Sequence, residues 1–237
     1  MIKINVDKEF WDLFPDAQIN VLVVKGLDNK VDGSDTAYFE GLLEKGKQEA
    51  KTHLTEEPFS QNPVIDEWRQ AFRQFKTKKG ARSSIEALLK RASQDRDFSP
   101  INPLVDIYNS VSLKYAVPCG GEDLDVIEGD LHLGKAKGGE PFFPLGAETD
   151  APALPEEIIY YDDEGAVCRC LNWREAKRTM LQEDTENAVL VIESINSEQA
   201  KRADQAASEL KNLVDAYFQL ESKTYTLTKD TPSVNVD

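Results

Sequence analysis

Cysteine and histidine are scarce in this chain of 237 residues, which contains three cysteines and two histidines. The unevenly spaced Cys119, Cys168 and Cys170 do not make a disulfide framework, and they fit a reducing compartment. Two thiols without a matching second pair of ligands do not make a zinc site either, so we expect no bound metal. Cys168 and Cys170 would point to the same face of a strand, where core packing is favoured over metal or redox work.

Glycine-rich phosphate-binding patterns are also missing. Neither GxxxxGKS/T nor GxGxxG occurs, so no nucleotide cofactor is expected, and no other cofactor is indicated. A histidine-based catalytic triad would have to use His53 or His132, and the alternating run DLHLG favours a surface strand position for His132. These absences argue against the common nucleotide-dependent and triad-based classes of enzyme.

Long apolar runs and positive charge are in short supply as well. No uncharged apolar stretch of about 18 residues occurs, and the opening MIKINVDKEFWDLF lacks the pattern of a signal peptide. We therefore expect no membrane span, no secretion and a cytoplasmic location. Lys and Arg total 28 against 43 Asp and Glu, which gives a formal charge of −15. Such an acidic chain does not bind nucleic acid indiscriminately, and we expect no DNA partner.

The hydrophobic residues that are present suffice for one sizeable core. They make up 40% of the chain and include 10 Phe, 7 Tyr and 3 Trp. A length below about 250 residues is compatible with one domain, and no internal repeat or low-complexity tract is found. We predict a single domain over residues 1–237.

Helices dominate the first half of the chain and strands the second. β-branched runs predict strands at 2–6 and 19–24. Capping residues followed by apolar positions at helical spacing predict four helices, which begin near Ser34, near Asn62, at Ser83 or Ser84, and near Asn102. Short apolar runs separated by Gly, Pro and Asp predict β-structure over residues 120–191. The combination predicts an α/β fold.

A long helix is predicted over residues 196–222. Its apolar positions are spaced by four and three residues, and they are Ala203, Ala207, Leu210, Val214 and Tyr217. Packing across the protein's own sheet is favoured over a coiled-coil partner, because the stripe is shorter than the three to four heptads that a coiled coil needs. An interaction protein that dimerises through Leu210 and Val214 stays open as a third functional hypothesis, and the sequence does not determine the oligomeric state.

Positive charge is concentrated in one window, residues 67–96. The window carries nine cations and three anions, so its net charge is +6 and the rest of the chain carries −21. A polyanion could be held locally there, while the acidic remainder discourages indiscriminate binding. A solvated helix surface explains the same window equally well.

Ordered motifs along residues 79–194 give a more specific indication. KGARSSIEALLKR is followed by INPLVDIYNSVSLKYAVPCGGEDLDVIEGDLHLGKAKGGEPFFPLG, and later by GAVCRCLNW and EDTENAVLVIES. The D-x-x-N pair, the later Pro, the acidic residue after it and the EDTEN run occur in this order. Together they resemble the editing domain of the phenylalanyl-tRNA synthetase beta subunit, in a freestanding version.

This resemblance implies both a fold and an activity. The fold is a partly rolled mixed β-sheet covered by helices, and the activity in the synthetase is hydrolysis of tyrosine wrongly esterified to the phenylalanine tRNA. The chain is thus expected to be an aminoacyl-tRNA deacylase that acts in trans, with tRNA or aminoacyl-tRNA as its partner. An aminoacyl ester is already activated, so an ordered water, oxyanion donors and a side-chain pocket suffice without a protein nucleophile.

The resemblance also implies candidate site residues in three segments. Catalysis is assigned to Asn109, Glu122 and Glu175. Substrate binding is assigned to Asp106, Gly120, Gly121, Asn172 and Trp173, and RNA binding to Lys79, Arg82, Lys90 and Arg91. A carboxylate at position 175 would bind a substrate ammonium or a phenolic hydroxyl. Helix capping, a tight turn or plain surface exposure are the alternative roles for these residues.

One difference from the family concerns catalysis directly. In bacterial synthetases the turn after the Pro contains a histidine tied to editing, whereas this chain has Gly120 and Gly121 there. Either other groups position the water or hydrolysis has been lost. A non-catalytic amino-acid or tRNA binding module is therefore the second functional hypothesis.

Overall fold

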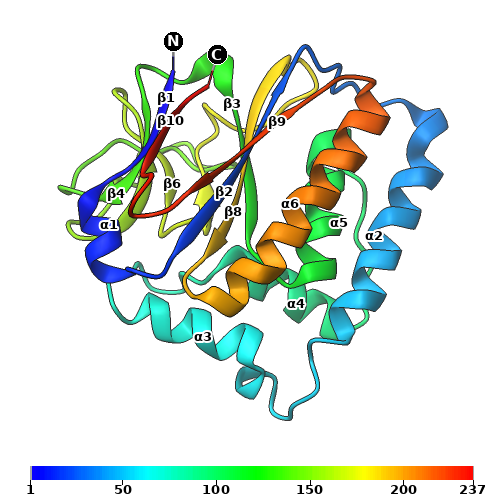
Figure 1. Ribbon diagram of the computed structural model, residues 1–237, viewed down its shortest axis with the longest axis horizontal. Helices are drawn as coiled ribbons and strands as arrows, with labels where there is room; N and C mark the ends of the chain where they lie inside the picture. Colours follow the sequence, from blue (N-terminus) through cyan, green and yellow to red (C-terminus); the bar gives the residue numbers. More distant parts are fainter. Residues whose placement is uncertain (1, 237) are drawn as a thin grey trace.

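The structure is a computed structural model that describes residues 2–236, and it contains two β-sheets with helices packed against them (Figure 1). The first sheet has six strands in the order β10-β1-β4-β5-β6-β7, and the second has four in the order β3-β8-β2-β9. Only β1 and β4 pair in parallel among these described strands. The strands are β1 (Lys3–Val6), β2 (Gln18–Lys25), β3 (Cys119–Asp123), β4 (Leu131–Lys135), β5 (Ile158–Tyr161), β6 (Ala166–Arg169), β7 (Arg174–Glu175), β8 (Asn187–Ser194), β9 (Lys223–Leu227) and β10 (Ser233–Asn235).

β2 lies inside the second sheet because it is apolar on both faces. Ile19, Val21 and Val23 are buried in the core that the two sheets share. Leu22 and Val24 point the other way, into the core beneath the helices. Since side chains alternate along a strand, a strand covered on both sides needs an unbroken apolar run. The two strands predicted near the start of the chain are confirmed.

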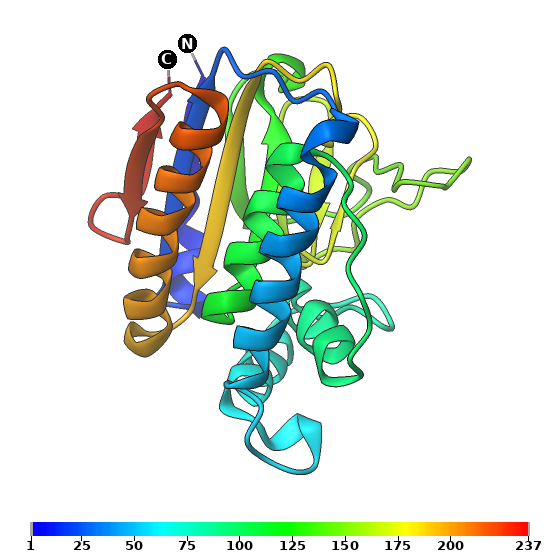
Figure 2. The same cartoon turned by 90° about the vertical axis from the view of Figure 1, so that its right-hand side faces the viewer.

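α5 and α6 lie on the outer face of the second sheet, and α2 lies against α5 (Figure 2). α6 contacts β2 and β8, α5 contacts β3 and α6, and α2 packs against α5. α3 and α4 lie together at the lower end of the view in Figure 1. The helices are α1 (Lys8–Leu13), α2 (Thr36–Lys51), α3 (Pro63–Phe72), α4 (Ser84–Ser93), α5 (Pro103–Tyr115) and α6 (Ser197–Phe218).

The start of α5 is held by a buried asparagine network. The Asn102 side chain accepts a hydrogen bond from the Val105 N–H, and Pro103 occupies the first helical position, where a missing N–H is tolerated. Asn29 donates to Asn102 Oδ1 at 3.0 Å and accepts from the Leu104 N–H at 2.9 Å. These bonds tie α5 to the segment that follows β2, and thereby hold the helix in a defined position beside the sheet.

α6 packs against its own domain and buries its apolar stripe. Leu210 and Val214 are 1% and 0% exposed and belong to the core between the helices and the second sheet. The predicted packing across the protein's own sheet is confirmed. The hypothesis of a dimer through Leu210 and Val214 is wrong, because both side chains are already covered by the rest of the described chain. The helix ends at Phe218, before the predicted residue 222, where Gln219 adopts a left-handed conformation.

Cys168 and Cys170 do not share a strand face, contrary to the prediction. Cys168 lies in β6, but β6 ends at Arg169 and Cys170 has a φ of 50°. A left-handed residue interrupts the alternation of side chains on which the prediction depended. Both thiols nevertheless belong to the buried core, as expected.

The predicted α/β class is confirmed. The strands are divided between two sheets that pack against one another, rather than collected in one rolled sheet, and one of the two is mixed. No helix within residues 2–236 combines the length and the apolar character needed to cross a bilayer.

Candidate functional site

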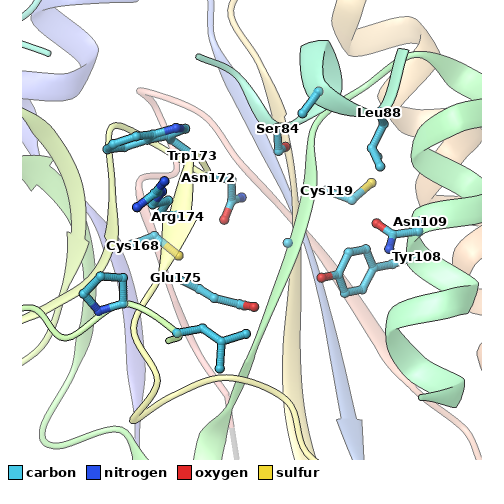
Figure 3. A pocket seen from close by; sticks show the side chains of 14 residues that line it. Ser84, Leu88, Tyr108, Asn109, Cys119, Cys168, Asn172, Trp173, Arg174 and Glu175 are labelled. Carbon is cyan, nitrogen blue, oxygen red and sulfur yellow. The ribbon is translucent and has the colours of Figure 1, made fainter. Parts of the chain in front are cut away.

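A cavity of about 410 Å³ opens between α4, α5, β3 and the turn that joins β6 to β7 (Figure 3). We call it the amino-acid cavity, after the ligand that the sequence resemblance leads us to expect there. Cavities of roughly 300–1,000 Å³ with a mixed apolar and polar lining are typical of small-molecule sites. Its lining residues are Ser84, Ala87, Leu88, Tyr108, Asn109, Cys119, Gly120, Pro144, Leu145, Cys168, Asn172, Trp173, Arg174 and Glu175.

α5 contributes Tyr108 and Asn109 to one wall of the amino-acid cavity. Figure 3 shows the Tyr108 hydroxyl and the Glu175 carboxylate directed towards one another from opposite sides. Tyr108 is only 9% exposed, and burial raises the pKa of its hydroxyl well above the usual value. The hydroxyl therefore stays protonated and can donate a hydrogen bond, while Asn109 offers both a donor and an acceptor.

β3 contains two glycines, and each allows a close approach on a different side of the strand. A Cβ at Gly120 would lie 2.3 Å from Asn172 Oδ1. A Cβ at Gly121 would lie 2.4 Å from Leu190 Cδ2, on the opposite side of the strand. Glycine at position 120 thus lets the Asn172 amide approach the strand, whereas glycine at 121 serves packing in the core.

The turn between β6 and β7 presents three further side chains. Cys170 and Leu171 both have positive φ angles, 50° and 56°, and this tight reversal brings the following residues over the cavity. Asn172 contributes a buried Nδ2 that has no hydrogen-bond partner within residues 2–236. The Arg174 guanidinium stacks over the Trp173 ring, with Cζ 4.9 Å from the ring centroid. The turn therefore supplies an amide donor, an aromatic wall and a cation at one rim.

Two glutamates at or near the amino-acid cavity have raised pKa values, Glu175 in its lining and Glu122 outside it. Burial raises the pKa of Glu175 to about 7. Glu122 is 6% exposed, and burial together with the nearby Glu175 raises the pKa of Glu122 well above its usual range. Cys168 Sγ lies 3.0 Å from Glu122 Oε1 and donates to it, while Glu122 Oε2 is buried without a partner in the described part of the chain. At neutral pH Glu175 therefore lies near the midpoint of its titration, while burial and the neighbouring Glu175 both disfavour the ionised form of Glu122.

The predicted catalytic and substrate-binding residues fall into two groups. Five line the amino-acid cavity, namely Asn109, Gly120, Asn172, Trp173 and Glu175. Asp106, Gly121 and Glu122 do not reach its surface. Asp106 is 2% exposed and accepts a hydrogen bond from the Ile101 N–H just before α5, so its contact is local to the helix start. Burial raises the pKa of Asp106 to about 6.

The four predicted RNA-binding cations are divided between the two ends of α4. Lys79 and Arg82 are exposed in the segment before the helix, beside the start that borders the amino-acid cavity. Lys90 and Arg91 lie in the last turn. Lys90 Nζ is 4.7 Å from the Phe59 ring centroid, and Arg91 donates to the Asp97 carbonyl. A ten-residue helix is about 15 Å long, so the four charges do not form one patch.

Several residues that line the amino-acid cavity were not predicted from the sequence. Tyr108 precedes Asn109 directly, but its apolar neighbours on α5 gave it the appearance of a core residue. Cys119 and Cys168 were assigned to structure alone or left without a role, and Leu145 comes from a Gly- and Pro-rich connection that carries no local signal. Only the convergence of distant segments identifies these side chains as cavity walls.

Neither histidine lines the amino-acid cavity, and no cluster of metal-binding side chains is found within residues 2–236. His53 bonds the Lys114 carbonyl, and His132 Nδ1 bonds Asp7 at 2.9 Å, and neither ring lines the cavity. Within residues 2–236, no cluster of three or more His, Cys, Asp or Glu side chains is arranged to hold a metal ion. His132 is half-buried in β4 and stacked on Tyr161.

Two known proteins resemble this chain, one in sequence and one in fold. Over 68 residues the chain is 35% identical to the phenylalanine–tRNA ligase beta subunit of Cutibacterium acnes, a match that covers 29% of this chain and 8% of that protein. An N-terminal fragment of the phenylalanyl-tRNA synthetase beta subunit from Pyrococcus horikoshii superimposes with a TM-score of 0.50 over 94% of this chain and 50% of that chain. At 12% identity, the second match shows a shared fold alone.

The family comparison is more specific. The chain spans about half of the P. horikoshii fragment and less than a tenth of the C. acnes relative. The model of the family described as the B3/4 domain matches residues 67–222, which is more than half of the chain and encloses the motifs at 79–194. The resemblance to the synthetase beta subunit is therefore confirmed, and the chain belongs to the B3/4 domain family.

Proposed function

We propose that this protein binds the aminoacylated 3′ end of tRNA and hydrolyses the ester of a wrongly attached amino acid. The observation that carries the proposal is the amino-acid cavity, in which Asn109, Asn172 and Glu175 from distant segments line one space. Family membership supports a role connected with tRNA. The proposal places the chain in the cytoplasm, where aminoacyl-tRNA is made and used.

The cavity offers the groups that an aminoacyl ester needs. Trp173 and Leu145 provide apolar walls for the side chain of the amino acid. The protonated Tyr108 hydroxyl donates to a carbonyl or a polar side-chain group. An aromatic or related amino acid suits this combination of walls and donors.

Hydrolysis in this cavity uses water as the nucleophile. A water held by Asn109 and the Glu175 carboxylate attacks the ester carbonyl carbon and gives its proton to Glu175. The Asn172 Nδ2 donor, which has no partner among the described residues, stabilises the oxyanion. The carbon–oxygen bond to the ribose then breaks and Glu175 returns the proton to the leaving oxygen, so the products are a free amino acid and a tRNA with free terminal hydroxyls.

Glu122 acts indirectly in this scheme. It is buried behind the cavity wall, and its pKa is raised first by burial and then by the nearby Glu175, so its neutral form is favoured. A neutral Glu122 leaves a single negative charge in the site. Glu175 can therefore ionise near pH 7, where a general base is most effective.

A deacylation panel tests the proposal. The purified chain is incubated with Tyr-tRNA, Phe-tRNA and a set of mischarged tRNAs, and the remaining ester is measured against time. We expect faster loss than in buffer for at least one ester. Buffer-level loss for every member of the panel would contradict the hydrolase proposal.

The absence of the family's histidine at Gly120 and Gly121 favours a second candidate, a module that binds the amino acid or tRNA without turnover. This candidate expects tight binding of an uncleaved aminoacyl-tRNA by the parent chain, and weaker binding after Glu175→Ala. Turnover by the parent chain would remove it. Binding is measured with a non-hydrolysable amide analogue, so that slow hydrolysis does not affect the result.

A further inference from the structure

A second cavity lies on the other side of the start of α4. Its volume is about 390 Å³, and it is bordered by the end of α3, by residues 77–83 and by the first turn of α4. Three arginines line it, Arg69, Arg73 and Arg82, and we call it the arginine cleft.

The three arginines are not equivalent. Arg69 pairs with the buried Glu86, with Nη2 2.6 Å from Oε1 and Nε also donating to the carboxylate. This pair neutralises the carboxylate that lines the cleft. Arg73 and Arg82 are exposed, and within residues 2–236 neither guanidinium has a carboxylate partner. The arginine cleft therefore carries two positive charges in excess.

Two serines at the start of α4 separate the arginine cleft from the amino-acid cavity. Ser83 is the N-cap residue and lines the cleft, while Ser84 lines the cavity, where Figure 3 shows its side chain. Ser83 is 3% exposed, and neither hydroxyl has a hydrogen-bond partner among residues 2–236. Buried hydroxyls are normally bonded, so this pair indicates a ligand that accepts hydrogen bonds on both sides of the helix start.

We infer that the arginine cleft binds a phosphodiester of an RNA 3′ end, held by Arg73, Arg82, the Ser83 hydroxyl and the first two N–H groups of α4, those of Ser84 and Ile85. The inference rests on the proposed function for the identity of the RNA. Guanidinium groups, a hydroxyl and helix-start N–H groups all donate, and phosphate oxygens accept. The N–H groups of Ser84 and Ile85 lack intrahelical acceptors, as at any helix start, whereas the Glu86 N–H donates to the Ser83 carbonyl at 3.1 Å.

The position of the arginine cleft favours RNA over free phosphate. Consecutive residues lie about 3.8 Å apart, so a ligand that contacts both Ser83 and Ser84 passes directly over the start of α4. An aminoacylated RNA end carries an amino acid and a phosphodiester on the same terminal nucleotide. One such ligand fills both spaces, whereas inorganic phosphate fills the arginine cleft alone.

Titration followed by NMR tests this placement. Inorganic phosphate and, separately, an uncharged RNA minihelix with a single-stranded 3′ tail are added to the full chain while amide signals are recorded. We expect both probes to shift the amides of residues 83–85, and the RNA to saturate at a concentration at least tenfold lower. Shifts confined to other parts of the molecule with both probes would overturn the site.

Charge removal provides the matched comparison. The variant Arg73→Gln/Arg82→Gln should bind the minihelix at least tenfold more weakly at low salt. Its plot of log affinity against log salt should be less steep by about 0.7 for each phosphate that the variant no longer neutralises. Lys25→Gln/Lys30→Gln removes the same charge from exposed positions at and after the end of β2 and should keep the parent slope. Equal slopes for the two variants would also overturn the site.

Ser83→Ala keeps every charge and removes a hydroxyl that bonds none of the described residues. It should fold as the parent chain does and still lose several-fold in RNA affinity. Deacylation data separate this inference from the proposed function. If the parent chain binds RNA through the arginine cleft but does not hydrolyse the ester, the binding site is supported and the hydrolase proposal is not. If the arginine variant hydrolyses the ester at the parental rate at subsaturating tRNA, the hydrolase proposal is supported and the binding site is not.

Discussion

The amino-acid cavity and the arginine cleft lie on opposite sides of the start of α4, and they differ in the sign and the burial of their charged side chains. The carboxylate that lines the amino-acid cavity, that of Glu175, is largely buried, and burial raises its pKa to about 7. The arginine cleft leaves Arg73 and Arg82 exposed to water. Desolvation makes a buried acid suitable for proton transfer, whereas exposed cations attract a polyanion in a salt-dependent manner. The comparison teaches that one helix start can separate a chemical site from a binding site.

The largest expected effect concerns Glu175. Glu175→Gln should lower the deacylation rate constant by roughly 10²–10⁴-fold, the range for loss of a general base. For the parent chain the rate should rise about tenfold per pH unit below pH 7 and level off above it, because the carboxylate must be ionised. The variant should lack this pH dependence. Glu40→Gln, at an exposed position on α2, is the control.

A smaller loss is expected from Gly120→Ala. The new Cβ would lie 2.3 Å from Asn172 Oδ1, so the amide must leave its present position in the cavity wall. Loss of one oxyanion donor reduces the rate constant by roughly 10²–10³-fold, and the melting temperature should change little because only a side chain is displaced. Gly41→Ala on α2, where a Cβ meets nothing within 4 Å, should keep full activity. A parental rate in Gly120→Ala would remove Asn172 from the mechanism.

The next effect is on stability. The folded-state pKa of Glu175 is raised from 4.5 to about 7, so ionisation opposes folding. The contribution of protonated Glu175 to the free energy of unfolding is fully present below pH 4.5. It is lost as the pH rises through about 7. The loss is roughly 2–3 kcal/mol at pH 8. Glu175→Gln should therefore stabilise the chain at pH 8 and not at pH 4, measured by urea unfolding. Equal effects at both pH values would contradict the burial argument.

The smallest effect distinguishes the two ends of α4. Arg82→Gln should weaken minihelix binding several-fold at low salt, because it removes a charge from the arginine cleft. Lys90→Gln should weaken it by less, since Lys90 lies in the last helical turn against the Phe59 ring. Fluorescence anisotropy at two salt concentrations measures both variants. A greater loss for Lys90→Gln would place the RNA along α4 instead of at its start.

Much of the fold could be predicted from the sequence because the signals are local. Asn102 and Pro103 start α5 where the capping pattern indicates, and the apolar run of β2 lies at the centre of a sheet. The position of Cys170 could not be predicted, because a left-handed turn ends the strand before it and no local residue signals that turn. The division of strands between two sheets depends likewise on long-range pairing, which capping and alternation do not encode.

The candidate site was only partly predictable for a related reason. Asn109, Asn172 and Glu175 could be named from family motifs, but Tyr108 and Leu145 were recognisable only after the chain had folded around them. Glu122 was assigned to the same pocket and lies behind its wall. A motif identifies residue types in order, whereas the direction of each side chain depends on how neighbouring elements pack.

The sequence by itself determined the amphipathic helices, the buried strand β2, the acidic total with a basic window at 67–96, and membership of the B3/4 domain family. These properties follow from spacing and composition, which act over a few residues. Only the tertiary structure decided that the pKa of Glu175 is raised to about 7. It also decided that Ser83 and Ser84 line different cavities and that the four predicted RNA-binding cations are divided between the two ends of α4. Burial and the strength of charge interactions depend on which distant segments exclude water from a group, and that is settled only when the whole chain has packed.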